Sequence, residues 1–270
     1  MGCAGSSSAS EKNYITAEIE IDADNVNKDV LIICSYEQSL KIDAAQKAQD
    51  AFDNGEETKK EDKINEELKN EEEVKTCEIK INDKNIPFSY YYKFPEKGKY
   101  KISYTFQNLI KADYLFYQCT AITSLDLSHF NSNSITNMRN MFFECKALKE
   151  INLSKMNTKN VVDFLGMFSY CESLTTLDLS SFNTQNVTIM AEMFLSCESL
   201  KYLNLSKFIT QKIEDDICLS CMFECCKALE KQNIITKDQR ILEQFDRDNF
   251  SGKRGEDGEE GCYAEGEEGY

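Results

Sequence analysis

A repeat with a period of 26 residues constrains the fold of this chain more than any other feature of its sequence. The repeat runs from about Tyr114 to Thr236. Each unit carries a Leu/Ile-x-Leu-Ser segment, a Phe or Met two residues later, and a Met-Phe pair near its end. One cysteine marks the same position in each regular unit: Cys119, Cys145, Cys171 and Cys197. A fixed period of this length is the signature of a solenoid of stacked repeats.

A single repeat cannot fold alone. Its apolar side chains would each contribute on the order of 2 kcal/mol if fully buried. Ordering the backbone of a whole repeat costs about 1–2 kcal/mol per residue in lost conformational entropy. Stacked copies bury these side chains against one another and add hydrogen bonds between neighbours, so stability belongs to the array.

The spacing within one unit predicts a short strand and a short helix. Residues 148–153 alternate apolar and polar side chains, with Leu148, Ile151 and Leu153 turned inward and Glu150 and Asn152 outward, which indicates a half-buried strand. Residues 138–145 place apolar side chains three and four positions apart, which is the spacing of one helix face. Thr136 precedes them as a candidate N-cap.

One string carries a family resemblance. Read from Met167 to Met190, the sequence is MFxxCxxLxxLDLSxFNTxNVTxM. It resembles the BspA-like leucine-rich repeat of bacterial surface proteins and many protist proteins. The resemblance implies a solenoid with parallel strands on one face and short helices on the other. It also implies a protein-binding habit and no enzyme activity.

The segment before the repeats predicts a β domain. Its sequence alternates apolar and polar residues in several short runs, and the last run, Gly98–Phe106, leads directly into the first repeat. In this the chain resembles protist proteins with BspA-like repeats, which often carry a similar β domain ahead of the repeats. Such a domain would also cover the open first repeat, which repeat arrays need.

We therefore expect an α+β fold with two main parts. An N-terminal antiparallel β-sandwich-like domain occupies residues 13–112 and carries an acidic, partly helical insert at 39–76. The leucine-rich-repeat solenoid with a C-terminal cap follows at 113–242. Residues 1–12 form a flexible tether, and residues 243–270 form an acidic Gly/Glu-rich disordered tail.

Composition limits the partners. The chain has 31 basic and 47 acidic residues, for a net charge of −16. Nucleic acid is therefore excluded as a partner, because phosphate binding needs a basic surface. No run of 18 or more apolar residues exists, so no segment is expected to span a bilayer, and no secretory signal follows Met1.

The N-terminus predicts a lipid anchor instead. Met-Gly-x-x-x-Ser at the start of the chain fits the N-myristoylation pattern at Gly2, and the adjacent Cys3 suits palmitoylation. Two acyl chains hold a protein stably on a membrane, whereas one holds it only marginally. The alternative is an ordinary flexible Ser-rich start. The anchor would place the protein on the cytoplasmic face of a membrane.

That location bears on the cysteines, of which the chain has twelve. The reducing cytosol disfavours disulfides, so we expect the cysteines of the repeats to be buried free thiols. A zinc site is the alternative for one cluster: Cys218, Cys221, Cys225 and Cys226. However, Met222 and Phe223 keep the Met-Phe register of the repeat within this cluster, which favours packing over metal binding. We therefore expect no cofactor and no metal.

Catalytic motifs are absent from the sequence. His129 is the only histidine, and we expect it in an exposed loop. No phosphate-binding glycine loop, nucleophile elbow, zinc-protease motif or EF-hand pattern occurs. No small-molecule substrate is evident either.

The outward positions of the predicted strands are the expected binding site. They form two columns, one along the middle of the sheet and one beside it: Asp126, Asn152, Asp178 and Asn204, and Ser124, Glu150, Thr176 and Tyr202. Sheet faces of repeat proteins commonly bind partners. The acidic insert is a second possible docking site.

The sequence thus predicts a non-enzymatic, membrane-anchored protein-interaction or scaffold module with a protein partner. One alternative is a cell-surface, adhesin-like BspA protein. The other is a cysteine-rich zinc-binding regulator.

Overall fold

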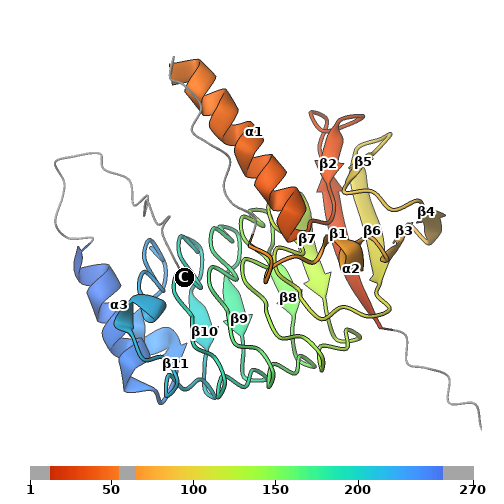
Figure 1. Ribbon diagram of the computed structural model, residues 1–270. Coiled ribbons are helices and arrows are strands. Elements are labelled where there is room, and N and C mark those ends of the chain that lie inside the picture. The colour runs from red at the N-terminus through yellow and green to blue at the C-terminus, as the bar shows by residue number, and fades with distance from the viewer. Residues whose placement is uncertain (1–12, 55–64, 252–270) are drawn as a thin grey trace, which may run out of the picture.

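Figure 1 shows the computed structural model of the protein, which describes residues 13–54 and 65–251. Before the repeats, the elements are β1 (Tyr14–Ile21), β2 (Asp29–Leu31), α1 (Tyr36–Asn54), α2 (Glu71–Val74), β3 (Glu78–Ile81), β4 (Lys84–Ile86), β5 (Tyr91–Lys93) and β6 (Gly98–Thr105). They are followed by β7 (Ile122–Asp126), β8 (Glu150–Asn152), β9 (Thr176–Asp178), β10 (Tyr202–Asn204), the short helices η1 (Asp216–Leu219) and η2 (Lys231–Asn233), β11 (Ile234–Ile235) and α3 (Gln239–Ser251).

β1 lies inside a six-stranded mixed sheet with the order β4-β3-β6-β1-β7-β8. It pairs antiparallel with β6 on one side and antiparallel with β7, the first strand of the repeats, on the other. β7 pairs parallel with β8. β9, β10 and β11 form a second, parallel sheet, and β2 pairs with β5. The sequence of β1 suits this central place because its alternate residues, Ile15, Ala17, Ile19 and Ile21, are buried.

The expected fold class, α+β with a β-sandwich-like domain followed by a leucine-rich-repeat solenoid, is wrong. β1 is hydrogen-bonded on both sides, so the N-terminal strands and the first two repeat strands belong to one mixed sheet. The described residues form a mixed α/β structure that consists mostly of sheets, with few helices. They contain neither a separate sandwich nor a regular alternation of strands and helices.

The short helices expected on the face opposite the strands are turns. Residues 138–145, which we expected to be helical, include Asn140 (φ 51°) and Glu144 (φ 54°) in the left-handed region, which ends a right-handed helix. Alternate N–H groups bond to the next repeat, and those of Met141, Phe143 and Cys145 bond three positions back instead of the four of an α-helix. The N–H of Asn140 donates to the Leu165 carbonyl at 2.8 Å, and that of Phe142 donates to Met167 at 3.0 Å.

These left-handed residues recur with the repeat. Two positions in each unit have positive φ: Tyr114 and Gln118, Asn140 and Glu144, Gly166 and Tyr170, Glu192 and Ser196, and Cys221 and Cys225. In the segment around each such pair, alternate N–H groups donate to the following unit, so neighbouring repeats are joined along the whole segment. In the first pair of repeats the donors are Ala112, Tyr114, Phe116 and Gln118.

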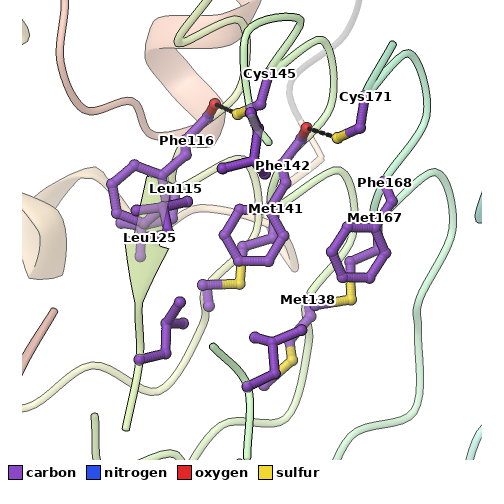
Figure 2. Close-up of a cluster of buried hydrophobic side chains, with 14 of the residues drawn as sticks. Leu115, Phe116, Leu125, Met138, Met141, Phe142, Cys145, Met167, Phe168 and Cys171 are labelled. Carbon is purple, nitrogen blue, oxygen red and sulfur yellow. Dashed lines mark hydrogen bonds between the residues drawn. The ribbon is translucent and has the colours of Figure 1, made fainter. Parts of the chain in front are cut away.

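The interior holds a column of stacked phenylalanines, one from each repeat, of which Figure 2 shows Phe116, Phe142 and Phe168. Their ring centroids are 5.3–6.0 Å apart and their planes nearly parallel: Phe116, Phe142, Phe168, Phe194 and Phe223. Tyr104 of β6 packs edge-on against the first ring at 5.3 Å, and Phe245 of α3 packs edge-on against the last at 5.6 Å. Both ends of the column are therefore covered.

Beside these rings, the cysteine of each later repeat donates a hydrogen bond to the previous repeat. The Sγ atoms of Cys145, Cys171 and Cys197 lie 3.2, 3.3 and 3.0 Å from the carbonyl oxygens of Phe116, Phe142 and Phe168 (Figure 2). Burial raises the pKa of each of these thiols well above its ordinary value. They are free thiols that add a weak polar contact to the packing.

Buried hydroxyls join the turns that follow the strands. Thr158 Oγ1 donates to the Asn183 carbonyl at 2.9 Å and accepts from the Asn183 N–H at 2.8 Å. Thr184 makes the same pair of bonds to Ile209. In the last repeat, Asp238 replaces the missing next unit and accepts from the Thr210 N–H at 2.6 Å.

α3 crosses residue 242, where we expected the folded cap to end and a disordered tail, 243–270, to begin. Phe245 is buried against the last ring of the column, and Asp248 accepts from the Phe223 N–H at 2.8 Å. The helix continues because it covers the open end of the repeats. Residues 252–270 lie outside the described residues, as do residues 1–12.

The expected insert, residues 39–76, rejoins the core at its end. Val74 is fully buried. Asn70 accepts from the Tyr36 N–H at 2.9 Å and donates to the Asp113 carbonyl at 2.7 Å, so it ties the start of α1 to the first repeat. A purely solvated insert would not do this.

Gly166 gives a test of the left-handed turns. An added Cβ would lie 2.0 Å from Asn140 Oδ1, and the backbone there has φ +58°. We expect Gly166→Ala to lower the free energy of unfolding by about 2–4 kcal/mol, measured by urea denaturation. In an Asn140→Ala background the clash is gone, and the same change should cost only about 1–2 kcal/mol. Equal costs in both backgrounds would refute the contact.

Candidate binding face

The structure places the eight predicted surface residues on β7, β8, β9 and β10, two on each strand. Apart from Ser124, Asp126 and Asn204, which are half-buried, all are exposed. They do not form one uninterrupted sheet. Within the described residues β8 ends the six-stranded sheet, and β9 begins the three-stranded one.

The column of Asp and Asn residues is used to end the strands. Each side-chain oxygen accepts from the N–H of the serine two residues later, at 2.8–3.2 Å: Asp126, Asn152, Asp178 and Asn204. Hydrogen bonds from Ser180, and then from Asn204, lower the pKa of Asp178, although partial burial opposes them. Asx turns of this kind are structural. This column is therefore only partly available to a partner.

The neighbouring column is available. Ser124, Glu150, Thr176 and Tyr202 make no side-chain hydrogen bond to another described residue in the structure. Tyr202 is 40 % exposed, and Ile235 of β11 is 44 % exposed. The two lie near each other, because Ile235 pairs with Asn204 of β10 in the sheet. We call these four residues and Ile235 the strand face.

An open hollow of about 450 Å³ lies at the N-terminal end of the strand face. Four predicted residues line it: Ser124, Asp126, Glu150 and Asn152. β1 and β6 add Thr16, Glu18 and Lys101. Glu18 pairs with Lys101 across β6 and with Ser124 across β7, so both signs of charge meet at this point.

Sequence reasoning missed these β1 and β6 residues. The alternation of β1 showed that Thr16 and Glu18 face outward. It could not show that β1 pairs with β7, which lies more than a hundred residues later. A strand pattern identifies a face but not the neighbour of the strand.

The four cysteines of the zinc alternative do not form a site. Cys226 is buried and donates to the Phe194 carbonyl at 3.0 Å, whereas Cys225 is exposed. Burial, and then hydrogen bonding to Glu224, raises the pKa of Cys221 to about 12, which disfavours a thiolate ligand. In the part of the chain that the structure describes, no group of three or more His, Cys, Asp or Glu could hold a metal.

A buried charge cluster inside the repeats was also missed. Asp113 is fully buried, and neither of its carboxyl oxygens has a hydrogen-bond partner among the described residues. Arg139 is paired with Asp163 at 3.5 Å, and its positive charge opposes the rise in the pKa of Asp113. Burial, and then the charge of Asp163, raises the pKa of Asp113 to about 8. Asp113 and Arg139 occupy the same position in successive repeats, which was the available signal.

Asp113→Asn tests this cluster. A folded-state pKa raised from about 4 to about 8 means that the folded protein holds a proton that the unfolded chain releases. Stability from Asp113 is thus complete below about pH 4 and is lost as the pH rises through about 8. We expect the variant to be more stable than the wild type by about 2–4 kcal/mol above pH 8, with the gap closing toward pH 4, in urea denaturation. The exposed control Asp24→Asn should leave the free energy of unfolding close to that of the wild type both above pH 8 and near pH 4.

Comparison with known proteins adds one similarity. A family model described as "Mycoplasma protein of unknown function, DUF285" matches residues 110–237, slightly less than half of the chain. No curated protein and no solved structure matches this chain. Among the described residues no helix has the length and apolar character needed to cross a bilayer. The predicted anchor residues, Gly2 and Cys3, lie outside the described residues.

Proposed function

We propose that this protein is a non-enzymatic interaction module that binds a protein partner through the strand face. The observation that carries the proposal is the state of the column next to the Asp/Asn column, which we call the free column. The polar groups of the turns and of the Asp/Asn column are engaged within the repeats, whereas Ser124, Glu150, Thr176 and Tyr202 have no internal hydrogen-bond partner in the described structure.

The shape of the face suits a protein more than a small molecule. Its hollow is open and is lined by side chains from four strands. Exposed Tyr202 and Ile235 lie beyond it on β10 and β11. Aromatic side chains are enriched at protein interfaces and often dominate their energetics.

We further propose that acyl groups on Gly2 and Cys3 hold the module at the cytoplasmic face of a membrane. The support is the sequence pattern at the start of the chain together with the similarity of its repeat to BspA-like repeats of protist proteins. The adhesin-like alternative would place the same face outside the cell. Labelling intact cells with a reagent that does not cross the membrane separates the two, since only an adhesin would be labelled.

The strand face is tested with Thr176→Arg. Thr176 is exposed at the middle of the free column, and a large charged side chain there would block a docked partner. Proximity labelling from the intact protein in cells should lose the partner signal by more than about ten-fold. Thr120→Arg adds the same charge at an exposed turn away from the face and should retain the signal. Equal loss in both variants, or in neither, would contradict the proposal.

The anchor is tested with Gly2→Ala. Without the N-terminal glycine no myristoyl group can be attached, and the palmitoylation that depends on it should fall as well. We expect the variant to move from the membrane to the soluble fraction on cell fractionation. Mass spectrometry of the wild type should show the acyl masses. A variant that stays on membranes as firmly as the wild type would rule the anchor out.

A further inference from the structure

One edge of the repeats carries several lysines, although the net charge of the chain is negative. It consists of the four segments that follow the strands: residues 128–136, 154–162, 180–188 and 206–213. These segments contain four lysines and no aspartate or glutamate, and exposed Glu214 follows the fourth segment directly. The lysines are Lys155, Lys159, Lys207 and Lys212, and we call this surface the lysine edge.

The four lysines are free to meet a partner. All are exposed, and none forms an ion pair with a described residue. Two lysines elsewhere on the repeats are paired, since Lys146 lies 3.6 Å from Glu172 and Lys227 lies 2.7 Å from Glu198, whereas exposed Lys149 and Lys201 form no ion pair with a described residue. The positive charge of the lysine edge is therefore not neutralised within the described fold.

The segments of the lysine edge lie side by side. The hydroxyl bonds from Ser132 to Asn157, from Thr158 to Asn183 and from Thr184 to Ile209 join each segment to the next. Neighbouring repeats are about 5 Å apart, so the four segments span about 15 Å. Ile209 is 40 % exposed between Lys207 and Lys212, which adds an apolar side chain to the basic surface.

The described chain begins at this same edge. The Tyr14 N–H donates to the His129 carbonyl at 3.2 Å, and the two rings stack at 4.7 Å. Asn13 Oδ1 accepts from the Asn131 N–H at 2.7 Å. Figure 1 shows β1 starting at the lower side of its sheet, and its antiparallel pairing places the end of β7 there. A group attached near Gly2 is thus joined to the body at the lysine edge.

We propose that the lysine edge docks on the anionic surface of the membrane that holds the acyl anchor. This inference rests on the anchor of the proposed function. The chain from Gly2 to Asn13 spans eleven residue steps, which reach at most roughly 36–40 Å, and it joins the body at the lysine edge. Basic side chains beside an acyl chain supply the second signal that one lipid needs for stable binding.

Charge complementarity selects the lipid surface as the partner. A net charge of −16 repels an anionic leaflet, so the orientation that turns the four unpaired lysines toward it is the favourable one, even though Asp178 and Asp238, which accept from Ser180 and Thr210, border the edge. Each lysine near such a surface strengthens binding by about five-fold. An exposed isoleucine among lysines also suits the boundary between head groups and acyl chains. The strand face then remains accessible beside the membrane.

Vesicle binding of the full-length myristoylated protein tests the docking. Two vesicle types are compared: phosphatidylcholine alone, and phosphatidylcholine mixed with phosphatidylserine. The variant carries Lys155→Gln, Lys159→Gln, Lys207→Gln and Lys212→Gln. We expect the wild type to prefer the mixed vesicles by at least about ten-fold, and the variant to lose most of that preference. High salt should likewise reduce the preference of the wild type for the mixed vesicles.

The matched control carries Lys84→Gln, Lys97→Gln, Lys149→Gln and Lys201→Gln, which are exposed lysines outside the lysine edge. It makes the same change in net charge and should keep the preference for phosphatidylserine. Equal loss in the control would assign the effect to net charge and overturn the proposal, as would an edge variant that binds like the wild type. Circular dichroism confirms that both variants are folded.

Two further outcomes are separable. If the edge lysines are needed to bind a poly-glutamate peptide but not the mixed vesicles, the edge serves an acidic protein and the membrane proposal is wrong. If Gly2→Ala stays on cell membranes, the acyl anchor fails. The unacylated chain then still tests the lysine edge, because its residual preference for mixed vesicles either depends on the four lysines or does not.

Discussion

Backbone hydrogen bonding between successive repeats is the interaction on which the rest of the structure depends. Alternate N–H groups of one turn segment donate to the carbonyls of the next, from Ala112–Gln118 through Met190–Ser196. Each such bond contributes about 0.5–1.5 kcal/mol net. They also fix the register, and a fixed register brings one phenylalanine ring of each unit onto the next. Repeats that could not order themselves singly are thereby stabilised together.

The same register divides the side chains into internal and external sets. Phenylalanines, thiols and threonine hydroxyls that bridge neighbouring repeats are already engaged, so they are poor candidates for recognition. The Asp/Asn column is half-engaged, because its oxygens close the strand ends. Only side chains that make no contact between neighbouring repeats remain available to a partner. These are the free column, which lies on the strands, and the lysines of the lysine edge, which lie in the segments that follow the strands.

The 26-residue period predicted most of the burial, because burial follows register: Leu148 and Leu153 are buried and Glu150 and Asn152 are exposed, whereas Ile151, which was expected inward, is half-buried. It did not predict local conformation. Met138, Met141, Phe142 and Cys145 have helical spacing, yet left-handed Asn140 and Glu144 divert the chain into turns. Sequence patterns report the side that is buried more reliably than the backbone that buries it. The hollow was missed for another reason, since β1 pairs with a distant strand.

Net charge is a poor guide to how this protein meets a surface. At physiological ionic strength, charges more than about 8 Å apart are largely screened from one another. The lysine edge spans about 15 Å, so a leaflet in contact with it interacts mainly with its four unpaired lysines. Acidic residues of α1 and the strand face lie elsewhere on the fold, and the nearer Asp178 and Asp238 accept hydrogen bonds from Ser180 and Thr210. A chain of net charge −16 can therefore present a cationic surface toward lipid. Repulsion between the leaflet and the remaining acidic surface would favour that orientation over others.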